Sequence, residues 1–339
     1  MGHGSVGRSI VITSINPPTA AVAAFAQRSP GNVLVVGDAK TPREWHCPGA
    51  VFVGLPQQES LAFRIVELLP RNHYTRKMVG YLLAAARDVD VIVDTDDDNI
   101  PKAEWNFPDF EIACDVVTGP AGFVNIYRLF TSGRIWPRGL PLRLIDDCRP
   151  VEVDHSTRIS RVGVWQGLAD GDPDVDALYR LTHREPVSFA ARAPVALAEG
   201  VVSPFNSQNT AWRRELFPLL YLPACVSFRF TDILRGLVAQ PIMWSEGYRL
   251  GFTGATVDQE RNPHDLQKDF EDEIPMYVHG EKVVAVVTRA IADCPDIPSK
   301  LSEAYRELVA AEIVPRQELA ILSAWLHDLD AIRVEREPG

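Results

Sequence analysis

The chain has 339 residues, of which 46% are hydrophobic and 23% are charged, and its formal net charge at pH 7 is -11. This composition is typical of a globular protein with an ample core, organised as one large domain or two ordinary ones. The acidic balance argues against a general nucleic-acid-binding protein, which needs a basic face, so we expect no nucleic-acid partner. An anionic ligand must then be held locally by a metal ion, a few basic side chains or helix N-termini.

The cysteines and the lack of long apolar runs both indicate the cellular compartment of the protein. The five cysteines are far apart and form no CxxC pair, which predicts a reducing compartment and neither a zinc site nor a disulfide framework. No apolar run approaches the length of a membrane span, and the first eight residues have no signal-peptide core. We therefore expect a cytoplasmic protein without a membrane span.

Strands and helices alternate over the first hundred residues. The sequence predicts strands over 9–15, 32–37, 50–53 and 91–93, and helices over 20–27, 60–69 and 76–87. Thr19 suits the N-cap of the first helix, and apolar residues at helical spacing support the helix over 76–87. This alternation predicts a parallel, Rossmann-type sheet.

The strand over 91–93 runs directly into four carboxylates, Asp94, Asp96, Asp97 and Asp98. Like charges this close repel one another unless a cation or water compensates them. Open α/β sheets bind ligands at the carboxyl ends of their strands. Hard cations such as Mg²⁺ or Mn²⁺ prefer oxygen ligands and often bridge one or two carboxylates to a diphosphate. The loop therefore predicts a metal-diphosphate site of the DxD kind.

The same loop admits three other interpretations. An EF-hand is excluded, because counting from Asp94 its sixth position holds Asn99 where Gly is needed, and its twelfth holds Trp105 where Glu is needed. An aspartyl-phosphate nucleophile has no supporting feature. A solvated acidic turn is less favoured because the preceding strand is so apolar.

Beyond residue 150 the pattern changes. The sequence predicts short strands over 162–164 and 187–189, a polar row over 206–210, a helix over 232–238 and a helical tail over 300–332 broken at Pro315. We expect a nucleotide-binding part over 9–150, an acceptor-side part of the same domain over 151–290, and a helical C-terminal extension over 291–339. The fold class is α/β, with a Rossmann-type, mostly parallel sheet and a mixed acceptor-side region.

Several ordered blocks resemble the STELLO-type family. They are 13–19, 35–38 with 41–42, 74–82, 94–101, 171–177, 204–210 and 260–265. The resemblance covers about residues 9 to 280 and implies a glycosyltransferase-like protein with a GT-A-type fold. It does not imply the Golgi membrane location of the plant members, because the chain has no anchor.

A more distant resemblance is to the reversibly glycosylated polypeptides, which include UDP-arabinopyranose mutases. It rests on the three aspartates 96–98 and on the segment 173–177. Those proteins carry a modified arginine after an Arg-Gly-aromatic-Pro stretch. The equivalent stretch here, 138–143, departs in spacing, so glycosylation is not assigned to Arg143.

A nucleotide-sugar enzyme must hold the base and ribose, neutralise the diphosphate and position the reacting groups. Donor contacts are predicted for residues at strand ends, for basic residues near the helix over 76–87 and for two of the acidic-loop carboxylates. They are Ser14, Asn16, Asp38, Arg71, Arg76, Lys77, Asp94 and Asp97.

The predicted metal ligands are Asp96, Asp98 and a late histidine, His264, holding Mn²⁺ or Mg²⁺. The histidine is assigned because GT-A enzymes often complete the metal shell in this way. Asp232 is the candidate general base, with a plain helix N-cap as its alternative. Candidate ligands for the sugar or acceptor are Asp174, Asp176, Asn206, Gln208 and Asn209, although the two aspartates also suit the cap of a helix over 175–181 and the amides a surface loop.

These features predict a metal-dependent glycosyltransferase that takes a nucleoside-diphosphate sugar, with a UDP-sugar favoured, and an unknown acceptor. A role in polysaccharide or natural-product assembly fits this chemistry. A mutase or autoglycosylating protein and a non-catalytic scaffold with the same fold are the alternatives. The sequence leaves a homo-oligomer open.

Overall fold

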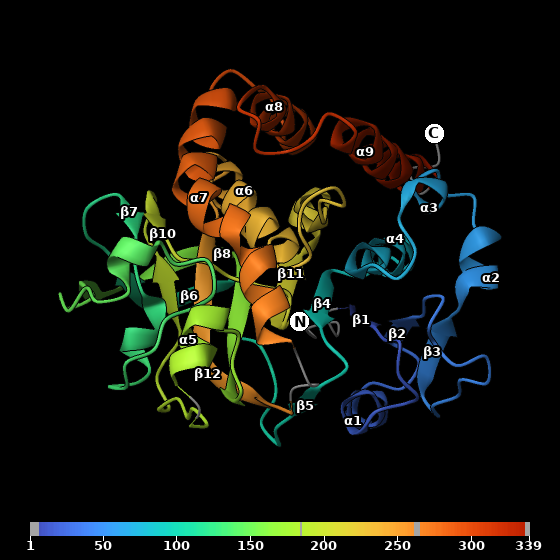
Figure 1. Ribbon diagram of the computed structural model, residues 1–339, viewed down its shortest axis with the longest axis horizontal. Coiled ribbons are helices and arrows are strands. Elements are labelled where there is room, and N and C mark those ends of the chain that lie inside the picture. The colour runs from blue at the N-terminus through green and yellow to red at the C-terminus, as the bar shows by residue number, and fades with distance from the viewer. Residues whose placement is uncertain (1–6, 184, 261–264, 336–339) are drawn as a thin grey trace, which may run out of the picture.

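A ten-stranded sheet runs through the computed structural model, which describes residues 7–183, 185–260 and 265–335 (Figure 1). Its strand order is β3-β2-β1-β4-β11-β8-β6-β9-β12-β5, and β7 and β10 form a separate pair. The strands are β1 (Arg8–Thr13), β2 (Val33–Val36), β3 (Ala50–Val53), β4 (Val91–Thr95), β5 (Asn99–Pro101), β6 (Glu111–Val117), β7 (Gly122–Phe123), β8 (Val153–Gly171), β9 (Val195–Leu197), β10 (Val201–Val202), β11 (Asn209–Arg213) and β12 (Arg249–Gln259).

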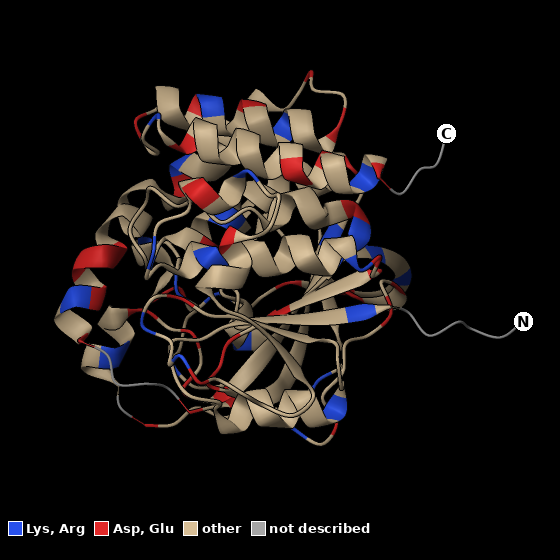
Figure 2. Ribbon diagram, turned by 90° about the vertical axis from the view of Figure 1, so that its right-hand side faces the viewer, with Lys and Arg blue, Asp and Glu red and all other residues tan. Residues whose placement is uncertain are grey.

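Helices lie on both sides of the sheet, with most of them stacked on one side (Figure 2). In Figure 1 the last two helices, α8 and α9, lie along the top of the molecule, and α7 runs from there down over its middle. The α-helices are α1 (Ala20–Arg28), α2 (Leu55–Glu59), α3 (Ile65–Leu68), α4 (Lys77–Ala86), α5 (Ala177–Thr182), α6 (Thr231–Ser245), α7 (Leu266–Ala290), α8 (Ile297–Ala310) and α9 (Glu318–Val334).

The first half of the sheet is parallel. Strand β1 pairs in parallel with both β2 and β4, and β2 pairs in parallel with β3. The order β3-β2-β1-β4 is that of the first half of a doubly wound fold, and it follows from apolar strands that are covered on both faces. The predicted α/β class is therefore confirmed, as are the strand over 50–53 and the Thr19 cap, whose side chain accepts from the backbone N–H of Val22.

The second half of the sheet is mixed. Strand β11 is antiparallel to both β4 and β8, while β12 is parallel to β8 and antiparallel to β9 and β5. The strand predicted over 162–164 is the buried centre of the much longer β8. The strand predicted over 187–189 is reduced to one bridge between Val187 and Gly171.

The helix predicted over 60–69 is wrong in its extent, because only the four residues of α3 are helical within that range and the short α2 ends just before it. Pro56 lies in the first turn of α2, where its fixed φ starts a helix earlier than expected. Helix α3 begins only after Arg64, and the carboxylate of Asp328 accepts from the backbone N–H groups of Arg64 and Ile65. A cap supplied by a distant helix leaves no local signal in the sequence.

The helical tail predicted over 300–332 is confirmed, and Pro315 lies between its two helices, α8 and α9. The preceding α7 was not predicted; it contains Pro275 and continues for 25 residues. Within the described ranges, no helix combines the length and apolar character needed to cross a membrane.

Candidate functional site

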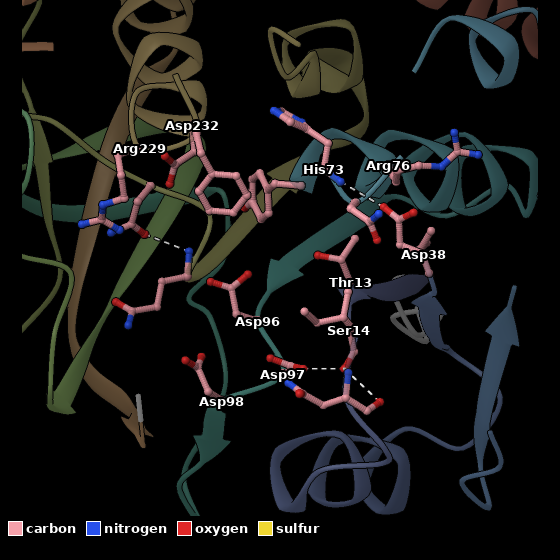
Figure 3. Close-up of a pocket in the computed structure, with 18 of the residues that line it drawn as sticks. Thr13, Ser14, Asp38, His73, Arg76, Asp96, Asp97, Asp98, Arg229 and Asp232 are labelled. Carbon is pink, nitrogen blue, oxygen red and sulfur yellow. Dashed lines mark hydrogen bonds between the residues drawn. The ribbon is translucent and has the colours of Figure 1, made fainter. Parts of the chain in front are cut away.

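A cavity of about 500 Å³ opens at the carboxyl ends of β1, β2 and β4. In an open α/β sheet this is the point where the strand order reverses and where ligands bind. The lining residues include Thr13, Ser14, Asn16, Gly37, Asp38, His73, Tyr74, Arg76, Asp96, Asp97, Asp98, Arg138, Asp174, Asn206, Gln208, Phe228, Arg229, Asp232 and Gln259. Figure 3 shows Asp96 and Asp98 between the ends of β1 and β2 on one side and Arg229 and Asp232 on the other.

Asp94 is turned away from the cavity and into the core. It has no exposed surface, and its oxygens lie 2.6 Å from Lys77 Nζ and 2.9 Å from Arg235 Nη1. Lys77 is equally buried and also donates to Thr95 O. The predicted donor contacts of Asp94 and Lys77 are therefore not supported, because both groups are engaged inside the protein.

Asp96 stands at the boundary between this buried pair and the cavity. Its side chain is 31% exposed, and one oxygen lies 2.9 Å from Lys77 Nζ. Burial raises the pKa of Asp96 to about 7, with Lys77 opposing the rise and Asp98 and Asp94 adding to it. A second positive charge at this carboxylate would relieve that repulsion.

Asp97 connects the acidic loop to the end of β1. One of its oxygens accepts from the hydroxyl of Ser14 and, at 3.0 Å, from the side-chain amide of Asn16. Its backbone carbonyl accepts from the hydroxyl of Thr19 at 2.6 Å. The structure thus brings together three residues that the sequence assigned to one donor pocket, Ser14, Asn16 and Asp97.

Asp98 lies at the far end of the loop. It accepts from Gln259 Nε2 at 3.3 Å, and Gln259 in turn accepts from the side chain of Gln208. These two hydrogen bonds connect the acidic loop to β12 and to the segment before β11, in the second half of the sheet.

The end of β2 and the segment before α4 complete this side of the cavity. Asp38 accepts from the backbone N–H of His73 at 3.0 Å and lines the cavity as predicted. Burial lowers the pKa of His73, and Asp38 opposes this effect.

Two of the predicted donor cations point elsewhere. Arg76 donates to Gln58 and to the carbonyls of Val66 and Leu69, so its guanidinium faces away from the aspartates of the acidic loop (Figure 3). Arg71 is exposed and paired with Glu59. The sequence assigned Arg76 to a diphosphate, but its guanidinium is instead hydrogen-bonded to backbone carbonyls before α4.

The opposite wall is organised around Arg138. Its guanidinium lies 2.8 Å from Asp174 Oδ2 and 2.9 Å from Asp232 Oδ2, and it also donates to the carbonyl of Arg229. Asp232 further accepts from the backbone N–H groups of Ser207 and Ile233. All these groups are nearly buried, so Asp232 is held in one orientation at the cavity wall.

Other polar residues of this wall are also held by hydrogen bonds and ion pairs within the protein. Asn206 donates to Asp174 at 2.8 Å and accepts from the backbone N–H of Gln208. Arg229 is paired with the buried Glu273 of α7 at 2.9 Å. The surface-loop alternative for the polar row over 206–210 is wrong, because all five residues are buried and the last two belong to β11.

Two predicted acceptor ligands do not reach the cavity. Asp176 is the N-cap of α5, accepting from Tyr179 N at 2.8 Å and from Trp136 Nε1 at 2.7 Å, which is the capping alternative. Asn209 is fixed inside the sheet by Trp105 and Thr256. The predicted metal ligand His264 lies outside the described residues.

Sequence reasoning did not assign several lining residues to the site, among them His73, Tyr74, Arg138, Phe228, Arg229 and Gln259. Arg138 and Arg229 left no signal in the sequence, because the need for a cation follows from the burial of Asp174 and Asp232, which only the structure shows. Arg143, by contrast, is exposed, pairs with Glu281 and does not line the cavity.

The charge of the cavity determines what it can hold. Of the lining residues that the structure describes, six are aspartates and three are arginines, and each arginine is already hydrogen-bonded within the protein. A diphosphate entering alone would meet net negative charge. No group of three metal-ligating side chains occurs among the described residues. Asp96 and Asp98 nevertheless fit a Mg²⁺ or Mn²⁺ ion, which proteins commonly hold through one or two carboxylates together with substrate phosphates.

Comparison with known proteins supports the resemblance seen in the sequence. The family model of the STELLO glycosyltransferases matches residues 229–337. "Probable glycosyltransferase STELLO1" of Arabidopsis thaliana is 27% identical over 342 residues, covering 95% of this chain and 44% of the relative. "Probable glycosyltransferase STELLO2" of the same plant is 31% identical over 283 residues, covering 77% and 37%. The predicted resemblance to this family is confirmed, and the chain spans less than half the length of these relatives.

Among solved structures, a mycobacterial protein has a TM-score of 0.41 at 11% identity over 82% of this chain and 76% of its own. M. tuberculosis glucosyl-3-phosphoglycerate synthase has a TM-score of 0.37 at 12% identity over 82% and 81%. TM-scores this low support no inference about the site.

Proposed function

We propose that this chain is a metal-dependent glycosyltransferase that transfers a sugar from a nucleoside-diphosphate sugar, with a UDP-sugar favoured, to a hydroxyl-bearing acceptor. The observation that carries the proposal is the acidic cavity at the strand-order reversal, where the carboxylates of Asp96 and Asp98 face a space lined by polar groups. The relationship to the STELLO glycosyltransferases supports the reaction class.

The donor would lie along the ends of β1, β2 and β4. Asp38, Ser14 and Asn16 provide oxygen and amide groups suited to the base and the ribose hydroxyls. Asp96 and Asp98 would hold Mn²⁺ or Mg²⁺, and the bound ion would supply Lewis-acid stabilisation of the leaving diphosphate. Lys77 keeps Asp94 and Asp96 in place from behind.

The acceptor would lie against the opposite wall. Asp174, Asn206 and Gln208 present carboxylate and amide groups to the cavity, which suit hydroxyl groups. In the transfer, the acceptor oxygen forms a bond to the anomeric carbon while the bond from that carbon to the diphosphate oxygen breaks. Asp232 would receive the acceptor proton in an inverting reaction. Its orientation is fixed by Arg138.

A thermal-shift panel of nucleoside diphosphates and their sugars, each with and without Mn²⁺, tests this proposal. A micromolar ligand at millimolar concentration stabilises the folded state by roughly 4 kcal/mol, which is a clear shift in melting temperature. We expect a shift with UDP or a UDP-sugar that requires the metal. The absence of any metal-dependent shift across the panel would overturn the proposal.

Intact-mass measurement on the same samples separates transfer from self-glycosylation. The predicted transferase gains no mass after incubation with the UDP-sugar. A gain of one hexose or pentose would favour the autoglycosylating alternative. The cytoplasmic location and a homo-oligomeric state stay predictions.

A further inference from the structure

Helix α9 contains two buried carboxylates on a face that is otherwise apolar. Glu318 has no exposed surface and Asp328 is 2% exposed. Apolar residues of the same helix, including Leu322 and Trp325, already pack it into the core. A buried carboxylate is unfavourable unless donors satisfy its oxygens. The donors that these two carboxylates use therefore indicate what they do.

Asp328 holds the segment that leads to the donor side of the cavity. Its two oxygens accept from the backbone N–H groups of Arg64 at 3.0 Å and Ile65 at 2.9 Å. These groups open α3, a helix with no side-chain cap of its own. Asp328 supplies the missing cap from a helix more than 260 residues further along the chain.

The position of α3 is then transmitted to the cavity through hydrogen bonds. Arg76 donates to the carbonyl of Val66 in α3 and to that of Leu69 just after it. Between Leu69 and Arg76 the chain passes through His73, whose backbone N–H donates to Asp38 in the cavity. Residues 70–76, here called the donor rim, connect α3 to α4, and the hydrogen bonds of Arg76 fix them to α3.

Glu318 holds the segment that leads to the acceptor side. It accepts from the hydroxyl of Tyr221 and from the backbone N–H groups of Ala224 at 2.8 Å and Cys225 at 2.7 Å. This irregular stretch connects the second half of the sheet to α6. It continues directly into the acceptor rim, residues 226–232, which includes Arg229 and Asp232 of the cavity wall.

The two rims meet at the cavity mouth. Phe228 of the acceptor rim is 49% exposed, and its ring makes edge contacts with the rings of His73 at 5.9 Å and Tyr74 at 5.8 Å. All three side chains line the cavity. A shift of either rim would therefore change the width of the mouth.

We propose that Asp328 and Glu318 are positioning residues, which set the donor rim and the acceptor rim respectively from one rigid helix. The names of the rims rest on the proposed function. The helical extension is, in this account, a brace that fixes the spacing between the two halves of the site.

Backbone amide exchange and binding of UDP with Mn²⁺, measured on the full chain, test the brace. The Asp328→Ala and Glu318→Gln variants are compared with Leu322→Ala, which removes apolar packing from the same helix. Asp328→Asn, which retains one acceptor oxygen, replaces Asp328→Ala in these measurements if the alanine variant does not fold. Measurements are made well below each melting temperature, so that global unfolding contributes nothing.

We expect Asp328→Ala to speed exchange over 61–76 and to weaken UDP binding by about tenfold, a change of about 1.4 kcal/mol. Glu318→Gln should speed exchange over 221–232 and leave UDP affinity within about twofold, while Leu322→Ala lowers the melting temperature without either local effect. Equal UDP affinity in Asp328→Ala and Leu322→Ala, or exchange that rises uniformly in all variants, would overturn the proposal. If the wild-type protein binds no UDP, the proposed function fails, and the exchange pattern alone still decides whether α9 braces these segments.

Discussion

The two walls of the cavity differ in how their charges are compensated. Following the proposed function, the wall with Arg138, Asp174 and Asp232 is called the acceptor wall, and the wall with Asp38 and the acidic loop is called the donor wall. On the acceptor wall Arg138 pairs with Asp174 and Asp232, and Arg229 pairs with Glu273, so every carboxylate there has a guanidinium partner within the protein. On the donor wall several aspartates face the cavity, and the nearest lysine, Lys77, is buried behind them. The difference indicates that the acceptor wall is organised before any ligand binds, whereas the donor wall has negative charge left for a cation to neutralise.

The largest effect is expected from removing the central cation of the acceptor wall. Arg138→Met leaves Asp174 and Asp232 buried without their partner, which should lower the free energy of unfolding by about 3–5 kcal/mol. Urea denaturation followed by circular dichroism measures this. Arg134→Met is the matched control, because Arg134 is exposed and pairs with Asp146, and a surface pair contributes about 0–1 kcal/mol. Similar losses of stability for both variants would contradict the claim that Arg138 compensates the buried charges of Asp174 and Asp232.

A pH dependence tests whether Asp176 is buried at the N-cap of α5 as the structure places it. Burial raises the pKa of Asp176 from 3.8 to about 6, against the hydrogen bonds from Tyr179 and Trp136. The folded state therefore binds the proton more tightly than the unfolded state, and stability falls as pH rises from about 4 to about 6. At 1.36 kcal/mol per pKa unit, the loss relative to Asp176→Asn is up to about 3 kcal/mol. Parallel stability curves for the two proteins across this range would contradict the assignment.

The smallest stability effect and a clear binding effect are expected on the donor wall. Ser14→Ala removes one hydrogen bond to Asp97, which lines the cavity. We expect a loss of about 1 kcal/mol in binding of UDP with Mn²⁺ and less than that in stability. Calorimetric titration and thermal melts of the same samples provide both numbers. Ser302→Ala, an exposed hydroxyl on α8 that bonds only its own helix, is the control. A variant that loses stability but not affinity would place Ser14 outside the donor site.

The same contrast explains what could be predicted from the sequence. Donor-wall residues follow apolar strands directly, so Ser14, Asp38 and the acidic loop could be assigned from the ends of the predicted strands. The acceptor wall is assembled from Arg138, from segments around 174, 206 and 232, and from α7, and their meeting depends on a mixed sheet that local patterns do not specify. Buried polar residues such as Asn209 also resemble loop residues in sequence, because only the tertiary structure supplies their partners.

The central claim is that Asp96 and Asp98 hold a divalent cation that allows a diphosphate to bind. Titration of UDP into the wild-type protein and into Asp96→Asn and Asp98→Asn, each with Mn²⁺ and with EDTA, tests it most directly. Asp146→Asn, an exposed aspartate away from the cavity, is the control. The account predicts binding only in the wild type and the control, and only with Mn²⁺. Equal UDP affinity with and without metal, or unchanged metal dependence in both acidic-loop variants, would contradict it.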